Sequence, residues 1–299
     1  MRTAFLFLIL GDMYMESKIL ITGITGNVGS EVAKILIGMD QPVKGAARNI
    51  TNIEKQYGGS IDYVKFDFED PNTYDAALKD VSRIFLIRPP QIGDVKKYIN
   101  PFIDRAKMRG IKHIVFLSII GADKNPFVPH NKIEKHLKTS GIAYTFLRAS
   151  FFMQNLSTFY KDIIKYQNDI FIPAGKGKTS FIDIRDIAEI AVKAFFDSTY
   201  RNNAYSLTGS EALDYFEVAN IFTDVLGRKI IYSNPSSSEY KTRMKILGEE
   251  KEFIKVMANL YFAVRLGIAA VITDETRKLL RKPPITMMEF VRDYSNCWR

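Results

Sequence analysis

The chain has 299 residues, of which 46% are hydrophobic and 25% charged, so it has enough apolar material for a substantial core. Its formal charge of +9 suits an anionic ligand, but Lys and Arg are interspersed with Asp and Glu, and we do not expect nucleic-acid binding. The single cysteine, Cys297, excludes an internal disulfide and a cysteine-based metal cluster, which favours a cytoplasmic protein. No apolar run reaches the roughly 18 residues that a membrane span requires.

Residues 1–17 precede the first predicted strand, and we interpret them as an N-terminal extension. The segment begins with MRTAFLFLIL, a short apolar block with one arginine, and has no small-residue cleavage site before the next motif. A second methionine, Met15, stands just before the strand that starts at Lys18. This arrangement fits a start-site extension better than a membrane anchor.

From Lys18 onward, short β-branched runs alternate with helical patterns, which predicts a parallel sheet covered on both faces. We therefore expect an α/β fold with a doubly wound parallel sheet, a Rossmann domain, over residues 18–202. From about Asn203 the pattern is mostly helical, with one strand near residues 229–233, and we expect a smaller substrate or lid region over residues 203–299. The predicted strands of the Rossmann domain are KILIT, PVKGAA, IDYVKF, RIFLI, HIVFLS and AYTFLR.

The segment ITGITGNVGS, residues 21–30, places three glycines with the spacing G-x-x-G-x-x-G between a strand and a helix. Glycine is needed there for a tight turn, for close approach of a pyrophosphate to the backbone and for packing of the helix on the strand. The phosphates would lie at the helix N-terminus. A glycine-rich turn without a ligand is the alternative. The residues predicted to bind the dinucleotide here are Gly23, Thr25, Gly26, Asn27, Val28 and Gly29.

Two later residues bear on the choice of dinucleotide. An NAD site has an acidic residue about twenty residues after the glycines for the ribose 2′-hydroxyl, whereas a 2′-phosphate is held by arginine. The second strand ends in GAARN, with Arg48 and no acid, so we expect NADP(H) to be preferred over NAD(H); an exposed surface arginine is the alternative. Asp67, after the third strand, is a candidate for the adenine edge or for the cap of a helix that starts near Pro71.

Other ionisable residues give no catalytic or metal-binding pattern. Asp183 and Asp186 could form a carboxylate pair, but the sequence DIAE from Asp186 to Glu189 predicts a capping box, so we assign them a structural role. We predict no metal site, because metal-ligand spacing is lacking among the three histidines, His113, His130 and His136.

Several segments resemble, in their order, the NmrA-like family of atypical short-chain dehydrogenases/reductases: ITGITGNVGSEVAKIL, AARN, VFLSIIGAD, SGIAYTFLRASFFMQN, FIDIRDIAEIA and YSLTGSEAL. The resemblance covers nearly everything after Lys18. It implies a Rossmann fold that binds NAD(P). The family includes NAD(P)H-dependent quinone reductases, reductases of plant phenolics and redox-sensing regulators that bind NADP without turnover, so fold and cofactor transfer to this chain more directly than chemistry does.

The resemblance also implies residues near the reacting end of the cofactor. Ser118 ends the fifth strand, where the wider superfamily has its catalytic serine; a serine bonded to local backbone is the alternative. A substrate pocket is implied after the sixth strand, whose carboxyl end faces the ligand crevice, and its flat aromatics suit a planar acceptor unless they belong to the core. The residues of this implied pocket are Phe151, Phe152, Met153 and Asn155.

Many short-chain reductases carry Tyr-x-x-x-Lys on one helix face, where the lysine lowers the pKa of the phenol that protonates the substrate oxygen. In FVPHNKIEKHL the tyrosine position is Val128 and the lysine is Lys132, so the phenolic proton donor is missing. Lys132 is the candidate for the nicotinamide ribose and, by resemblance to the phenolic reductases, for catalysis; a solvated lysine is the alternative. A quinone needs no strong proton donor, because its reduced oxygens are weakly basic.

Two hypotheses follow. The first is an NADP(H)-dependent reductase that transfers a hydride to a quinone or a similar planar small-molecule substrate. The second is a non-catalytic redox sensor that binds NADP(H) and acts through a protein partner. The amphipathic stretch NLYFAVRLGIAAVI, residues 259–272, would favour the sensor if its apolar face lacks a partner, whereas a core helix is the simpler interpretation.

Overall fold

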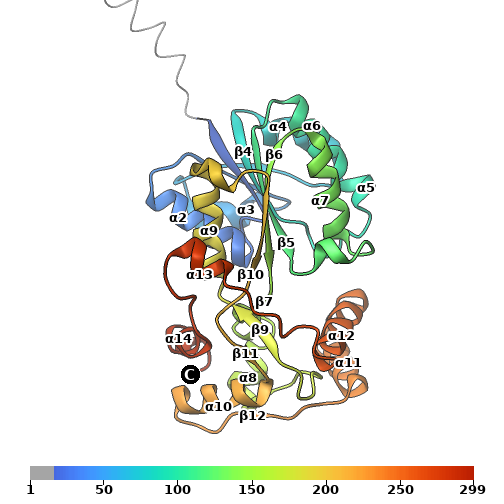
Figure 1. Ribbon diagram of the computed structural model, residues 1–299, viewed down its shortest axis with the longest axis vertical. Coiled ribbons are helices and arrows are strands. Elements are labelled where there is room, and N and C mark those ends of the chain that lie inside the picture. The colour runs from blue at the N-terminus through green and yellow to red at the C-terminus, as the bar shows by residue number, and fades with distance from the viewer. Residues whose placement is uncertain (1–16) are drawn as a thin grey trace, which may run out of the picture. The chain divides into compact units, whose positions relative to one another are not determined.

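The computed structural model describes residues 17–299, so the predicted extension over residues 1–17 lies, except for Ser17, outside the described residues. Figure 1 shows the elements along the chain. The strands are β1 (Lys18–Thr22), β2 (Val43–Ala47), β3 (Asp62–Lys65), β4 (Val81–Leu86), β5 (His113–Ile119), β6 (Ala143–Ala149), β7 (Phe151–Phe152), β8 (Asp169–Ile170), β9 (Thr179–Ile182), β10 (Asn203–Leu207), β11 (Ala212–Leu213) and β12 (Ile231–Tyr232).

The α-helices and shorter 3-10 turns connect these strands. The helices are α2 (Asn27–Gly38), α3 (Ile50–Tyr57), α4 (Tyr74–Leu78), α5 (Val95–Tyr98), α6 (Asn100–Met108), α7 (Pro129–Ser140), α8 (Lys161–Gln167), α9 (Ile184–Phe196), α10 (Tyr215–Leu226), α11 (Ser237–Ile246), α12 (Lys251–Arg265), α13 (Glu275–Leu280) and α14 (Met287–Asp293). The 3-10 turns are η1 (Pro71–Thr73), η2 (Ala122–Lys124), η3 (Met153–Leu156), η4 (Ser198–Tyr200) and η5 (Ser295–Cys297).

The chain folds into two compact units. Among the described residues, unit 1 consists of 17–117, 123–146 and 191–203. Unit 2 consists of 118–122, 147–190 and 204–299. The chain therefore passes between the two units several times.

The seven-stranded sheet has the strand order β10-β6-β5-β4-β1-β2-β3. β1 pairs in parallel with β2 and β4, β2 pairs in parallel with β3, and β4 with β5. The central strand β1 is buried except at Lys18, which explains why its sequence is a continuous apolar run. The predicted doubly wound parallel sheet is confirmed.

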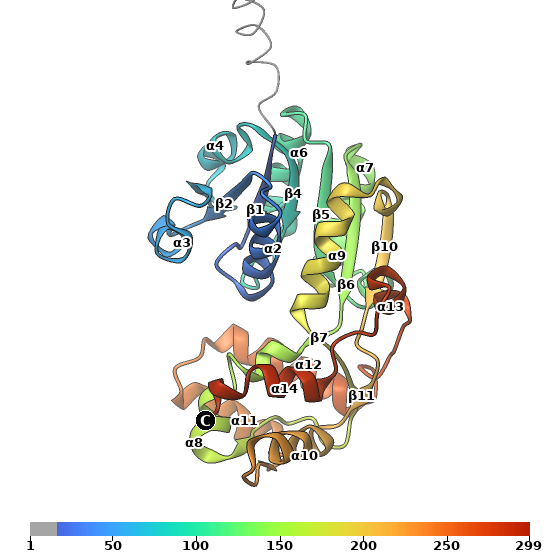
Figure 2. The same ribbon diagram turned by 90° about the vertical axis from the view of Figure 1, so that its left-hand side faces the viewer.

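Helices cover both faces of the sheet in unit 1. In Figures 1 and 2, α2 lies on one face, and α6 and α7 lie on the other. α2 buries Val28, Val32 and Leu36, which recur at the helical spacing of four residues. With both faces covered, the carboxyl ends of the strands are the part of the sheet available to a ligand.

One expectation about the chain after Asn203 was wrong. The strand expected near residues 229–233 forms, as β12, but β10 starts at Asn203 and joins the edge of the seven-stranded sheet. All residues of β10 except Leu207 are exposed or half-buried, so their sequence has no apolar pattern. Backbone pairing, more than an apolar pattern, specifies such an edge strand. For example, the Leu207 carbonyl accepts a hydrogen bond from the Ser150 N–H at 3.0 Å.

Unit 2 has its own core, which is rich in aromatic side chains. The small sheets β11-β9-β7 and β12-β8 contribute to it together with α10, α11, α12 and α14. Trp298, next to the last residue, is 1% exposed, packs edge-on against Phe222, and donates its indole N–H to the Leu156 carbonyl at 3.2 Å. The C-terminal residues are thus an integral part of this core.

Candidate functional site

The glycine loop joins β1 to α2 in unit 1. Gly23 has a φ of +65°, which favours glycine, and its carbonyl accepts from the Gly26 N–H at 2.9 Å. At Gly29, in the first turn of α2, an added Cβ would overlap the Gly23 carbonyl oxygen and lie 2.8 Å from the carbonyl carbon and 3.0 Å from the Ile24 Cα. Glycine is therefore required at Gly29 for the helix to pack on the loop.

The N-terminus of α2 is open to a ligand. Its N-cap is Gly26, which has no side chain to accept hydrogen bonds, and its first turn has no acidic residue. Gly23, Thr25 and Gly26 are exposed, whereas Val28 and Gly29 are buried beneath them. Unsatisfied N–H groups at the positive end of a helix dipole bind phosphate, so the loop fits the pyrophosphate of a dinucleotide.

Behind the loop, Thr22 joins the carboxyl ends of β1 and β4. Its buried hydroxyl accepts from the Ile87 N–H at 2.8 Å and donates to the Phe85 carbonyl at 3.2 Å. Ile87 also lies against Gly23, where an added Cβ would be 3.4 Å from the Ile87 side chain. Neither positioning residue is among those predicted from the sequence, where the signal is a hydroxyl residue at the end of an apolar strand, directly before the first glycine.

Arg48 directly follows β2, the strand next to β1. Its side chain is exposed, and within residues 17–299 no acidic side chain pairs with it. The next residue, Asn49, is the N-cap of α3 and accepts from the Thr51 N–H. The carboxyl end of β2 thus presents a guanidinium group with no carboxylate next to it in the sequence.

Asp67 lies at the same edge, after β3, which pairs with β2. It is half-buried, and its Oδ1 accepts from the Glu69 N–H at 3.0 Å. The suggested alternative, that Asp67 caps a helix near Pro71, is wrong: Asp70 is the N-cap of η1 and accepts from the Asn72 N–H, because it directly precedes the turn. Arg48 and Asp67 therefore follow adjacent strands on the side of β1 where the adenosine half of a dinucleotide binds in such folds.

Val128 and Lys132 do not share a helix face as the tyrosine-lysine spacing requires. Val128 is the N-cap of α7, with φ −76° and ψ 142°, because Pro129 in the first helical position disfavours a helical conformation in the residue before it. Lys132 lies on α7, and its side chain is exposed. Its ammonium group forms no ion pair within the described residues.

The other residues implied near the reacting end of the cofactor belong to unit 2. Ser118, the second-last residue of β5, is 1% exposed. Phe151 and Phe152 form β7, pair with β9, and are half-buried. Asn155 is also half-buried, whereas Met153 is 1% exposed inside the core. Phe151, Phe152 and Asn155 thus retain exposed surface, and Met153 is a packing residue of unit 2.

The capping box predicted at Asp186 is wrong, because α9 begins two residues earlier, at Ile184. Asp186 lies in the first turn, and its carboxylate accepts from the Ile285 N–H at 2.8 Å. Burial raises the pKa of Asp186 to about 6. Asp183 precedes the helix and accepts from the backbone N–H and the guanidinium group of Arg185 at 2.8–3.0 Å. Both carboxylates thus bind groups of the protein itself.

The histidines have separate surroundings. His113 is buried and hydrogen-bonds the Thr145 hydroxyl at 2.9 Å, and His136 pairs with Asp104 at 2.7 Å. In the described part of the chain, no cluster of three His, Cys, Asp or Glu side chains is arranged to hold a metal ion. Among the helices within residues 17–299, none combines the length and the apolar character that crossing a membrane requires.

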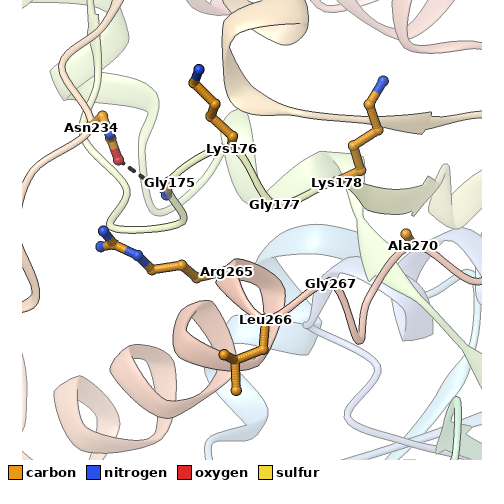
Figure 3. A pocket seen from close by; sticks show the side chains of 9 residues that line it. All are labelled: Gly175, Lys176, Gly177, Lys178, Asn234, Arg265, Leu266, Gly267 and Ala270. Carbon is orange, nitrogen blue, oxygen red and sulfur yellow. Dashed lines mark hydrogen bonds between the residues drawn. The ribbon is translucent and has the colours of Figure 1, made fainter.

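A hollow of about 730 Å³ lies on unit 2, where the loop of residues 173–178 meets the end of α12. Figure 3 shows three cationic side chains around it, Lys176, Lys178 and Arg265. Lys178 pairs with Glu217 at 2.8 Å, whereas Lys176 and Arg265 have no acidic partner within residues 17–299. The hollow suits an anionic group. The hollow is not among the sites predicted from the sequence, where the run GKGK at 175–178 is its signal.

The fold and the glycine loop define a dinucleotide-binding α/β protein. The NmrA-like family model matches residues 15–291, and the chain belongs to this family. It is 32% identical to the uncharacterized oxidoreductase YesF of Bacillus subtilis over 96% of this chain and 98% of that protein. It is 31% identical to the NAD(P)H azoreductase of Xenophilus azovorans over 93% of this chain and 98% of that protein.

Among solved structures, the NADPH-dependent quinone oxidoreductase QOR2 of Escherichia coli, complexed with NADPH, matches with a TM-score of 0.81. The two proteins are 24% identical, and the match covers 94% of this chain and 100% of that chain. The predicted family and fold are confirmed. The relatives named as an oxidoreductase and an azoreductase support the prediction that this protein is an enzyme, an NAD(P)H-dependent reductase.

Proposed function

We propose that the protein is an NADP(H)-dependent reductase that transfers a hydride to a quinone or a similar planar electrophile. The observation that carries this proposal is the glycine loop at an uncapped helix N-terminus, with Arg48 exposed at the end of the neighbouring strand. A carboxylate at this position would repel a 2′-phosphate, whereas a guanidinium group binds it with charge-assisted hydrogen bonds. NADP(H) is therefore the preferred cofactor in this proposal.

Each part of the cofactor has a candidate partner in unit 1. The N–H groups at the start of α2 would hold the pyrophosphate, Arg48 the 2′-phosphate and Asp67 the adenine edge. Lys132, whose ammonium group has no ion-pair partner within the described residues, would bind the nicotinamide ribose. Bound NADPH supplies the hydride, and these residues fix the position of the nicotinamide.

Two features support a planar acceptor. Phe151 and Phe152 keep part of their rings exposed after β6, and flat aromatic side chains stack on conjugated substrates. The azoreductase relative is named for azo substrates, and azo and quinone groups are both conjugated acceptors of two electrons. Ser118 would contribute its hydroxyl near the acceptor.

The function is tested by following NADPH oxidation with a panel of quinones and azo compounds, beside a titration of NADPH and NADH binding. Turnover with at least one acceptor is expected. Arg48→Asp should weaken NADPH binding more than NADH binding, by about 2 to 3 kcal/mol, because repulsion replaces a charge-assisted contact. Lys55→Asp on α3 makes a similar change of charge at an exposed side chain and serves as the control. Equal losses for both nucleotides would refute the assignment of Arg48.

A redox sensor is the second candidate, because one observation favours it. Of residues 259–272, Tyr261 and Val264 are buried in the core of unit 2, but Phe262, Leu266 and Ile268 are each more than 60% exposed. The part of the stretch within α12 thus joins the core on one side, and exposed apolar side chains extend from α12 into the residues that follow it, which suits a protein partner. NADPH binding without turnover of any acceptor would favour the sensor.

A further inference from the structure

His130 has an unusual environment at the start of α7. It is the second residue of the helix, and its ring stacks on Phe116 of β5, with centroids 5.9 Å apart and planes inclined by 27°. The residue is half-buried. Nδ1 is enclosed and has no hydrogen-bond partner within residues 17–299, whereas Nε2 is not enclosed in this way. The ring therefore has one nitrogen facing the protein and the other available for a ligand.

The charged group that acts electrostatically on this ring is Arg88, which follows β4. Its Nη1 donates to the carbonyl groups of Pro89, Pro90 and Ile92 at 2.7–3.0 Å, so the guanidinium group is fixed in its own loop. Burial and the charge of Arg88 lower the pKa of His130 to about 3. The positive end of the α7 dipole acts in the same direction. The imidazole is thus neutral at physiological pH.

The adjacent strands β4 and β5 place this histidine on the same side of the sheet as the glycine loop inside unit 1. Ile87, the residue before Arg88, packs on Gly23 and is fixed by Thr22. β4 and β5 are adjacent strands, so Ile87, Arg88 and the Phe116–His130 stack follow one another along the carboxyl side of the sheet. This is the side of the sheet on which a bound dinucleotide would lie.

We propose that His130 donates a hydrogen bond from Nε2 to the acceptor atom on which negative charge develops during reduction. This role rests on the proposed reductase function. In this proposal the neutral imidazole carries its proton on Nε2, and the enclosed Nδ1, which has no hydrogen-bond partner within residues 17–299, keeps the lone pair. His130 thereby takes over the polarising role of the phenol that is missing at Val128, from a position two residues further along the chain.

The chemistry balances without a proton from the histidine. A quinone acceptor gains a hydride, which carries two electrons, from the bound nicotinamide. The oxygen that becomes negative receives the hydrogen bond from His130 and then takes a proton from solvent. A neutral imidazole N–H can stabilise an oxyanion in this way while keeping its proton.

The test uses two substitutions at His130 and one at His136, on a different face of α7. His130→Phe preserves an aromatic ring for the stack on Phe116 but removes the donor, and His130→Gln retains an N–H donor. We expect His130→Phe to lower kcat by about 10- to 1000-fold, as for removal of an oxyanion donor, and to change the dissociation constant of NADPH by less than about threefold. His130→Gln should recover part of kcat. His136→Phe, the control, should leave kcat unchanged.

A spectroscopic measurement tests the state of the ring in the absence of turnover. Nitrogen-15 chemical shifts of the imidazole groups, assigned by loss of the signal in His130→Phe, should show a neutral ring with its proton on Nε2 at pH 6.5. An imidazolium ion, or a proton on Nδ1, would overturn the inference. Unchanged kcat in His130→Phe with an active wild type would overturn the role of His130 alone, whereas an inactive wild type would overturn the reductase function as well.

Discussion

Substitution of Gly29 by alanine tests the glycine loop directly. The new Cβ would lie 2.8 Å from the Gly23 carbonyl carbon and 3.0 Å from the Ile24 Cα, whereas carbon atoms make favourable contacts at about 3.5 to 4.0 Å. The neighbouring atoms are backbone, so α2 and the loop must separate by about 0.5 to 1 Å. Overpacking of this kind costs about 1 to 3 kcal/mol of the free energy of unfolding.

The separation of α2 from the loop should also weaken binding of the cofactor. The N–H groups of the loop would lose their alignment with the pyrophosphate, and the loss of one hydrogen bond to a charged group weakens binding by about 2 kcal/mol, or roughly 30-fold in the dissociation constant. Titration of NADPH fluorescence measures this change, and a thermal melt measures the cost to folding.

Gly38 provides the matched control on the same helix. It is the last residue of α2, and an added Cβ would meet no atom within 4 Å. Gly38→Ala should bind NADPH like the wild type and gain a few tenths of a kcal/mol in stability, because alanine restricts the unfolded chain. If Gly29→Ala binds NADPH as tightly as Gly38→Ala does, the loop does not hold the pyrophosphate.

Two further predictions concern Asp186 and Lys132. The pKa of Asp186 in the folded protein, about 6, is above its ordinary value, so the stability that this carboxyl contributes is present below its ordinary pKa and lost as pH rises through about 6. Asp186→Asn retains an acceptor for the Ile285 N–H and should raise the free energy of unfolding at pH 8 by up to about 3 kcal/mol, with a smaller gain at pH 5, as measured in urea. An equal gain at both pH values would contradict this account. Lys132→Met should weaken NADPH binding by about 1 to 3 kcal/mol; unchanged binding and turnover would identify Lys132 as a solvated surface lysine.

The sequence by itself determined the parts of this protein that depend on short-range contacts. The strand KILIT and the helix NVGSEVAKILIG occupy the residues expected for them, because an apolar run, a turn of glycines and a helical repeat act within a few residues of one another. The need for glycine at position 29 is also set by short-range contacts, since the atoms that exclude a side chain belong to residues only five to six positions earlier. Pro129 likewise fixes the start of α7 locally, because it disfavours a helical conformation in the residue before it.

The tertiary structure decided whatever depends on groups that are distant in the sequence. β10 is a strand because of its place at the edge of the sheet, and Asp186 binds the Ile285 N–H, which is 99 residues away, instead of capping its own helix. His130 showed no pattern in the sequence, because its neutral state follows from Phe116 and Arg88, which belong to other elements. Burial and the charge of neighbouring groups set a pKa, and neither is defined until the chain has folded.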